Sequence, residues 1–189
     1  MNWLMPPETD AQERIWMAFP PQGASVFEDA KSAHEARTAW AAVAHAIIDF
    51  EPVSMIVDPA DRAVAPKYLS REIDVVEAPL DDAWMRDIGP TFVRGTDGRV
   101  AAVDWVFNGW GARDWARWDN DAHIGRFVGQ LAGVETSHPP WSTKAEASRL
   151  TARARCWSPK LCSSIPRAIP GSISVRWRPS SRARSGRDT

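Results

Sequence analysis

The charge of this chain changes abruptly near Ser137, and this change limits which part can fold. Residues 1–137 contain 12 Lys and Arg against 22 Asp and Glu, whereas residues 138–189 contain 11 against 2. The overall formal charge of -1 therefore hides an acidic first part and a basic second part. Hydrophobic periodicity also stops at this boundary. We expect residues 1–137 to fold and residues 138–189 to be disordered, because the latter bury too little apolar surface to offset their ordering entropy.

Length and composition predict one globular domain. The 189 residues are 44% hydrophobic and 25% charged, which is typical of globular proteins. No apolar run approaches the roughly 18 residues of a membrane helix, and the N-terminus lacks the pattern of a signal peptide. Both cysteines, Cys156 and Cys162, lie in the basic part, so residues 1–137 carry no disulfide framework. We expect a cytoplasmic protein without a membrane partner.

Strand and helix patterns alternate along residues 1–137. The predicted strands cover residues 16–19, 53–57, 73–76, 91–93 and 100–107, and the predicted helices cover residues 27–50 and 115–132. A hairpin turn is predicted at 96–99, with Asp-Gly at its centre. The helices show apolar stripes made of Trp40, Val43, Ala44 and Ile47, and of Ile124, Phe127, Val128 and Leu131. This alternation favours an α/β or mixed α+β fold.

Residues 80–90, which we call the acidic segment, hold the side chains best suited to binding. They include Asp81, Asp82, Trp84 and Asp87. A carboxylate accepts paired hydrogen bonds from a guanidinium group, and an aromatic ring stacks on the same planar cation. The acidic segment therefore indicates a site for a planar cationic guest. The alternative is a solvated acidic turn in which Arg86 pairs with a neighbouring carboxylate.

Four stretches of residues 1–137 resemble one enzyme family, in the family order. They are Met5–Glu8 with Glu13–Ala18, Val53–Val57, Leu80–Pro90 and Val103–Gly111. Over these stretches the chain is similar to the N-terminal part of agmatine deiminases, within the bacterial-type peptidylarginine deiminase family. The Trp-Met-Arg-Asp-Ile-Gly-Pro stretch is highly specific. The resemblance implies an α/β fold, a five-bladed propeller of the pentein type, of which residues 1–137 would form only the N-terminal units.

The resemblance also implies a reaction and its residues. In the family, a cysteine thiolate attacks the guanidinium carbon of agmatine, ammonia leaves, and water hydrolyses the intermediate to N-carbamoylputrescine, a precursor of putrescine and polyamines. Asp87 matches the aspartate that binds the guanidinium nitrogens, and Trp84 matches a tryptophan beside the substrate. Asp81 and Asp82 occupy the acidic approach. The resemblance implies no metal, organic cofactor or nucleic-acid partner, and it leaves open a homo-oligomeric full-length enzyme.

The nucleophile and the acid/base histidine of the family have no counterpart in this sequence. In the family both lie well downstream of the matched stretches, and neither Cys156 nor Cys162 has a family-like context. Their Cys-x5-Cys spacing is also not that of a metal site. His34, His45 and His123 fall on predicted helices and are expected to be ordinary surface or core residues. The sequence therefore predicts a truncated and inactive chain.

The basic part is compatible with a frameshift. Shifted by one base, the codons of residues 141–147 permit V-N-E-G-G-G, and those of residues 150–171 permit D-G-E-G-T-V-L-V-T-E-T-V-Q-L-D-P-A-R-N-P. Both strings resemble the next segments of the deiminase family, which indicates that residues 138–189 are an out-of-frame tail. Two alternatives stay open. One is a genuine basic tail that binds nucleic acid or anionic lipid, and the other is a non-catalytic guanidine-binding or interaction protein.

Overall fold

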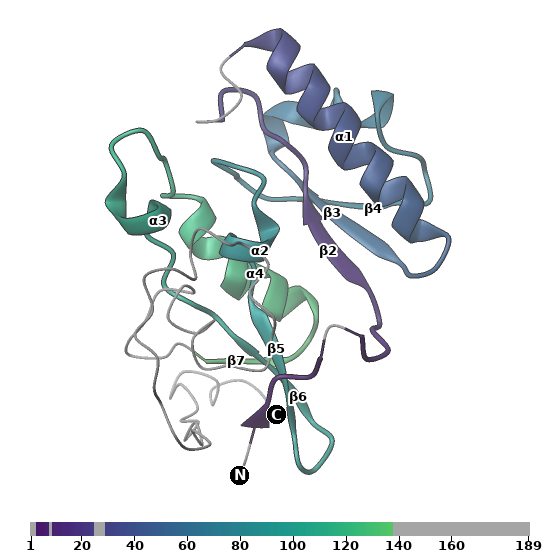
Figure 1. Ribbon diagram of the computed structural model, residues 1–189, viewed down its shortest axis with the longest axis vertical. Coiled ribbons are helices and arrows are strands. Elements are labelled where there is room, and N and C mark those ends of the chain that lie inside the picture. Colours follow the sequence, from purple (N-terminus) through teal and green to yellow (C-terminus); the bar gives the residue numbers. More distant parts are fainter. Residues whose placement is uncertain (1–2, 8, 25–28, 138–189) are drawn as a thin grey trace, which may run out of the picture.

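The computed structural model describes residues 3–7, 9–24 and 29–137, so the predictions made for residues 138–189 lie outside the described residues. The chain forms two β-sheets with helices packed against them (Figure 1). The strands are β1 (Trp3–Leu4), β2 (Ile15–Ala18), β3 (Val53–Val57), β4 (Asp74–Glu77), β5 (Thr91–Gly95), β6 (Val100–Val103) and β7 (Glu135–Ser137). The helices are α1 (Ala30–Ile48), α2 (Met85–Ile88), α3 (Gly109–Ala112) and α4 (Ile124–Leu131), with 3-10 turns η1 (Pro59–Asp61), η2 (Ala65–Lys67) and η3 (Asp121–His123). The predicted α/β class is confirmed.

The first sheet has the order β2-β3-β4, and its strands are parallel. All five residues of β3 are buried, as expected for a central strand covered on both faces. The connection from β2 to β3 is α1, which lies along one face of this sheet (Figure 1). Asp29 and Ser32 form a capping box at its start, where the Ser32 N–H donates to Asp29 Oδ1 at 2.7 Å.

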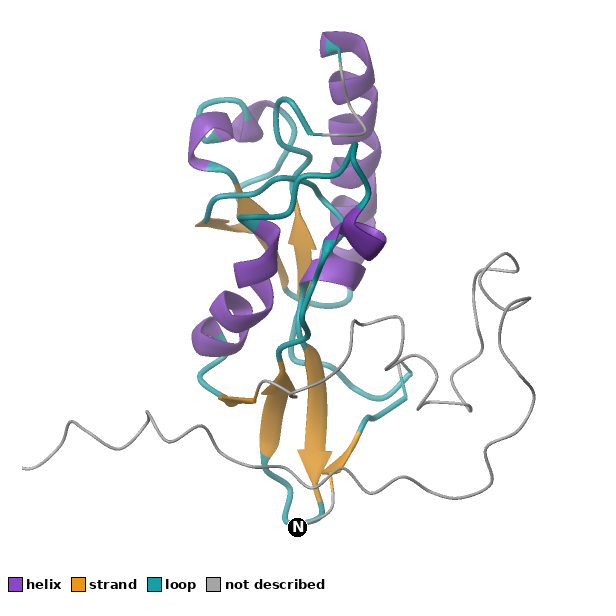
Figure 2. Cartoon of the chain, turned by 90° about the vertical axis from the view of Figure 1, so that its left-hand side faces the viewer, coloured by secondary structure: helices purple, strands orange, loops and turns teal. Residues whose placement is uncertain are grey.

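The second sheet has the order β1-β5-β6-β7, and Figure 2 shows it beyond the first sheet along the long axis of the molecule. Strands β5 and β6 form the predicted hairpin, and Gly98 supplies the positive φ of 82° that its turn requires. Helix α4 lies directly on this sheet. A Cβ atom at Gly125 would overlap the Asp104 side chain, and one at Gly129 would come within 2.5 Å of Thr136 Oγ1. The two glycines therefore permit the close approach.

A buried ion pair ties α1 to the loops beside the first sheet. Arg37 Nη2 donates to Asp61 Oδ1 at 2.7 Å, and Arg37 Nε donates to the Pro20 carbonyl at 3.0 Å. The other Asp61 oxygen accepts the Gln22 N–H at 2.8 Å. The Arg37 guanidinium also lies 5.2 Å from the centre of the Phe19 ring. Since both buried charges have hydrogen-bond partners, the pair is tolerated in the core.

The strand predicted over residues 100–107 is too long, since β6 ends at Val103. Beyond it the chain bends into α3, where all four residues have positive φ between 55° and 95°. This left-handed turn is closed by Asn108, whose side-chain oxygen accepts the Gly111 N–H at 3.0 Å. The apolar residues that suggested a longer strand pack on the turn instead, because the Phe107 ring contacts the Trp110 ring edge-on.

The helix predicted over residues 115–132 is also too long, since η3 and α4 cover only its second half. The preceding residues do not continue the helix, because Asn120 donates its main-chain N–H and its side-chain amide to Asp81. Two apolar stripes need correction as well. Val43 on α1 is 52% exposed and Leu131 on α4 is 46% exposed. The buried residues of α1 are Ala33, Ala36, Arg37, Ala41 and Ala44.

We expect Arg37→Met to lower the free energy of unfolding by about 3–5 kcal/mol, because Asp61 would keep a buried charge without its counter-ion. Lys31→Met is the matched control, since Lys31 lies on the same helix and pairs with Glu35 at 3.9 Å on the surface. Its cost stays within about 0.5 kcal/mol. Urea unfolding followed by tryptophan fluorescence measures both variants. Equal stability of the two would contradict the assigned role of the ion pair.

Candidate functional site

The acidic segment connects the two sheets and lies near the middle of the molecule (Figure 1). Its central part is α2, a single turn that packs against β2 and η3. Ile88 is 3% exposed and anchors this turn in the core. Trp84, immediately before α2, and Asp87, within it, are both half-buried. We call Trp84 and Asp87 the contact pair, because both side chains are partly accessible at one short turn.

The main-chain N–H groups just before the contact pair donate to carboxylates rather than to a neighbouring strand. Four consecutive N–H groups, those of residues 80–83, all donate to aspartate side chains. The bonds run from Leu80 to Asp58 Oδ2 (3.0 Å), from Asp81 and Asp82 to Asp121 Oδ1 (2.9 and 3.3 Å), and from Ala83 to Asp82 Oδ1 (2.8 Å). Buried N–H groups need acceptors, so these oxygens make the irregular backbone possible.

The Asp81 carboxylate in turn accepts hydrogen bonds from the segment that contains Asp121. This carboxylate accepts the Asn120 N–H at 2.7 Å, the Asn120 side-chain amide at 2.9 Å and the Asp121 N–H at 3.4 Å. We call this reciprocal set of bonds between residues 81–82 and 120–121 the carboxylate clamp. It joins two segments about 40 residues apart in the sequence. The clamp therefore fixes the acidic segment against η3.

Burial raises the pKa of two of these carboxyl groups. Asp121 is 0% and Asp82 is 1% exposed, and Oδ2 of each has no hydrogen-bond partner among the described residues. Burial, helped by the nearby charges of Asp81 and Asp82, raises the pKa of Asp121 to about 7 despite the N–H groups that lower it. Burial also raises the pKa of Asp82, against the lowering effect of the Ala83 N–H and the Trp84 side chain.

The indole of Trp84 rests on a second tryptophan. The Trp40 and Trp84 rings meet edge-to-face, with centroids 5.6 Å apart and an angle of 78°. Trp40 Nε1 also donates to the Ala83 carbonyl at 3.4 Å. These contacts connect α1 of the first sheet to the contact pair. An aromatic ring supported in this way loses little freedom when a planar guest stacks on it.

The four predicted site residues lie on one continuous segment, where they have different environments. Asp81 and Asp82 hold neighbouring backbone, whereas the contact pair keeps accessible surface. The alternative of a solvated acidic turn does not describe Asp82, which is buried. Sequence reasoning missed Asp58, Asn120 and Asp121. Asn-Asp just before the apolar repeat of α4 is a helix-start pattern, and this signal could have pointed to the last two.

A second aromatic cluster stands beside the left-handed turn of α3. The Trp110 and Trp115 rings stack with centroids 5.5 Å apart at 22°, and Phe107 meets Trp110 edge-on at 5.1 Å. Trp110 has a φ of 57°, which is unfavourable for a residue with a side chain. The stacking contacts offset this backbone strain.

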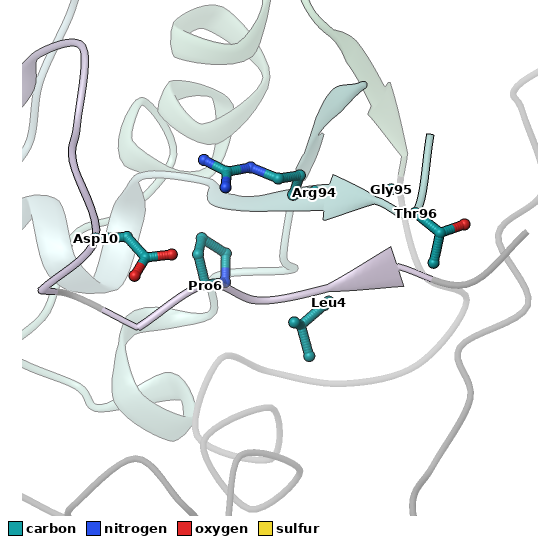
Figure 3. A pocket seen from close by; sticks show the side chains of 6 residues that line it. All are labelled: Leu4, Pro6, Asp10, Arg94, Gly95 and Thr96. Carbon is teal, nitrogen blue, oxygen red and sulfur yellow. The ribbon is translucent and has the colours of Figure 1, made fainter. Parts of the chain in front are cut away.

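A small hollow of about 140 Å³ lies where β1 passes the end of β5 (Figure 3). It is lined by Leu4, Pro6, Asp10, Arg94, Gly95 and Thr96. Figure 3 shows the Arg94 side chain lying over Pro6. None of the predicted site residues lines this hollow.

The histidines of the described segments have ordinary surroundings. His34 Nδ1 and the Tyr68 hydroxyl are 2.8 Å apart, and the Ser70 N–H donates to His45 Nε2 at 3.1 Å. His123 is exposed on η3. Within residues 3–7, 9–24 and 29–137, no group of three or more His, Cys, Asp or Glu is arranged to hold a metal ion. In the same ranges, no helix has the length and apolarity needed to cross a membrane.

Residues 4–147 match the Porphyromonas-type peptidyl-arginine deiminases. A Streptomyces coelicolor protein with a provisional agmatine deiminase name is 54% identical over 140 residues, which are 74% of this chain and 41% of that protein. The agmatine deiminase of Stutzerimonas stutzeri is 40% identical over 131 residues, which are 67% of this chain and 35% of that protein. The chain therefore spans about two fifths of the length of the curated relatives it matches.

A solved structure gives the same correspondence. The agmatine deiminase of Enterococcus faecalis is similar with a TM-score of 0.67 and 30% sequence identity, over 74% of this chain and 38% of that chain. The arrangement of the two sheets and their helices is therefore one that a known deiminase also contains.

We expect Asp121→Asn to flatten the pH dependence of folding. The pKa of Asp121 is raised from 3.8 to about 7, so its stabilising contribution is complete below about pH 4 and is lost as the pH rises through about 7. The free energy of unfolding of the unsubstituted chain should therefore fall, relative to the variant, across this range. Urea titrations at several pH values measure the difference. A constant difference from pH 4 to 7 would contradict the raised pKa.

Proposed function

The chain belongs to the Porphyromonas-type peptidyl-arginine deiminase family, and from this premise we propose that it derives from an agmatine deiminase whose guanidinium-binding part is residues 1–137. The reaction is hydrolysis of a C–N bond of the agmatine guanidinium to N-carbamoylputrescine and ammonia. The observation that carries the proposal is the contact pair, a carboxylate and an indole at one short turn inside the family-matching residues. The relatives with agmatine deiminase names support the same substrate.

In this proposal the contact pair touches the guest. The Asp87 carboxylate accepts paired N–H groups from the guanidinium, and the Trp84 ring packs on its planar face. Asp81 and Asp82 add negative potential and hold the backbone of the acidic segment in place. Agmatine carries two positive charges at neutral pH, so a group of carboxylates favours its approach.

The proposed architecture of the full-length enzyme is the five-bladed α/β propeller of the pentein type. Two sheets with packed helices support the assignment of residues 1–137 to its first units. A propeller closes its ring by packing its last unit against its first. A cytoplasmic location and a homo-oligomeric full-length enzyme belong to the same proposal.

For this chain itself we propose binding of a guanidine without turnover. Cys156 and Cys162 are its only cysteines, and both lie outside the family-matching residues 4–147. The proposed origin of residues 138–189 is a shifted reading frame, which the reversal of charge after Ser137 supports. The second candidate is a protein with an intended non-catalytic role in guanidine binding rather than an inactive product of a shifted frame, and the absence of cysteine from residues 4–147 is compatible with it.

We expect the chain to bind agmatine, and Asp87→Ala to weaken this binding about 10- to 100-fold, because a hydrogen bond to a charged group contributes about 1.5–3 kcal/mol. Asp49→Ala is a control that changes the charge equally on an exposed residue at the end of α1. Isothermal titration with agmatine, and with 1,4-diaminobutane as the analogue without a guanidinium, measures both effects. Equal binding of the two ligands, or an unchanged affinity of Asp87→Ala, would count against the proposed site.

We also expect no ammonia release when the chain is incubated with agmatine, since no family-like thiolate is present to attack the guanidinium carbon. Ammonia release that disappears in Cys156→Ser or Cys162→Ser would overturn this expectation. Resequencing the DNA across codons 134–150 tests the proposed frameshift. Family-like codons continuing in the other frame would support it, and their absence would favour a genuine basic module.

A further inference from the structure

We infer that Asp121 is the positioning residue of the guanidine site: its carboxylate holds the main chain of residues 81–82 and thereby sets the place of the contact pair on α2. The inference rests on the proposed function for the identity of the guest. Its structural content, that Asp121 fixes the acidic segment, rests on the clamp alone. Asp121 lies outside the acidic segment and was not among the residues that the sequence pointed to.

Asp121 supplies what the acidic segment lacks. Residues 80–83 belong to neither a strand nor a helix, and their N–H groups donate to aspartate side chains instead of to a neighbouring strand. Asp121 Oδ1 accepts two of these groups, from Asp81 and Asp82, at 2.9 and 3.3 Å. Removing a shared acceptor would leave two N–H groups near the core without partners. The backbone there would therefore have to move.

The position of the contact pair depends on this backbone, because a helix as short as α2 does not fix its own orientation. It contains four residues, and Trp84 at its N-cap forms no side-chain cap. Its packing partners are β2 and η3, and Asp121 is the first residue of η3. Asp121 therefore belongs to the turn that packs against α2 and also holds, through its side chain, the segment before α2. A shift of either would move the Asp87 carboxylate and the Trp84 ring away from their present positions.

Asp121 acts through the backbone rather than on the guest. Its side chain is 0% exposed, and its Oδ1 atom is already committed to two main-chain donors. A guest that reaches Asp87 at the half-buried surface of α2 does not reach this oxygen. Asp121 is therefore a positioning residue and not a contact residue.

The test compares three variants of the full chain. Asp121→Ala removes the acceptor, Asp121→Asn keeps one side-chain oxygen for the two N–H groups, and Asp119→Ala removes an exposed charge two residues away. Amide hydrogen exchange is measured at residues 81–88 and, as an internal reference, across β3. Agmatine affinity is measured by isothermal titration on the same samples.

We expect Asp121→Ala to lose protection at residues 81–88 while β3 keeps its protection, and to bind agmatine at least 10-fold more weakly. Asp121→Asn should restore most of the protection and bind within about 3-fold of the unsubstituted chain, as Asp119→Ala should. Unchanged protection at residues 81–88 in Asp121→Ala would overturn the inference. So would an equal loss across β3, which would indicate general destabilisation. If Asp121→Ala does not fold, failure of Asp121→Asn to keep protection at residues 81–88 overturns it.

The proposed function and the positioning role can fail separately. An unsubstituted chain that binds no agmatine would refute the proposed guest, and the exchange data would still decide whether Asp121 fixes the acidic segment. Asp121→Ala could also lose protection at residues 81–88 as expected and still bind agmatine with unchanged affinity. That result would refute the link between the carboxylate clamp and agmatine binding.

Discussion

Carboxylate oxygens that accept main-chain N–H groups hold the centre of this molecule together. Between the two sheets the chain runs through residues 80–83 without a strand partner, and aspartates take the place of that partner. Asp58 at the end of the first sheet holds one end of this connection, and Asp121 beside the second sheet holds its middle. The relation between the sheets therefore depends on a few ionisable groups as well as on apolar packing.

Burying carboxylates is electrostatically unfavourable, and the surroundings of Asp61 and Asp121 differ in how far they compensate for it. Both oxygens of the buried Asp61 are compensated, one by Arg37 and the other by the Gln22 N–H. Burial, with the nearby charges of Asp81 and Asp82 added, raises the pKa of Asp121, whose second oxygen has no hydrogen-bond partner among the described residues. The proposed binding of a cation would be favoured by the same group of carboxylates whose burial and mutual repulsion raise the pKa of Asp121.

The parts of the structure that follow from local pattern could be predicted from the sequence. Strand β3 was predicted with its observed bounds, because a continuous apolar run between turn residues leaves little choice. The α4 boundary was wrong because apolar spacing carries no information about Asn120, whose polar groups turn toward Asp81. Asp87 and Trp84 were predicted as site residues from the composition of one short segment and from the family resemblance, and their role stays a prediction. Asp121 was missed because its partners lie 40 residues away, and no periodicity records a contact of that range.

The distance along the chain between the two halves of the clamp has a consequence for biosynthesis. Residues 81 and 82 leave the ribosome about 40 residues before the aspartate that holds them. At roughly 5–20 residues per second, the acidic segment waits about 2–8 seconds for its partner. The first sheet has all its strands by then, so it can form while α2 still lacks the contacts that η3 supplies. The contacts that complete the surroundings of α2 therefore become available only when η3 arrives.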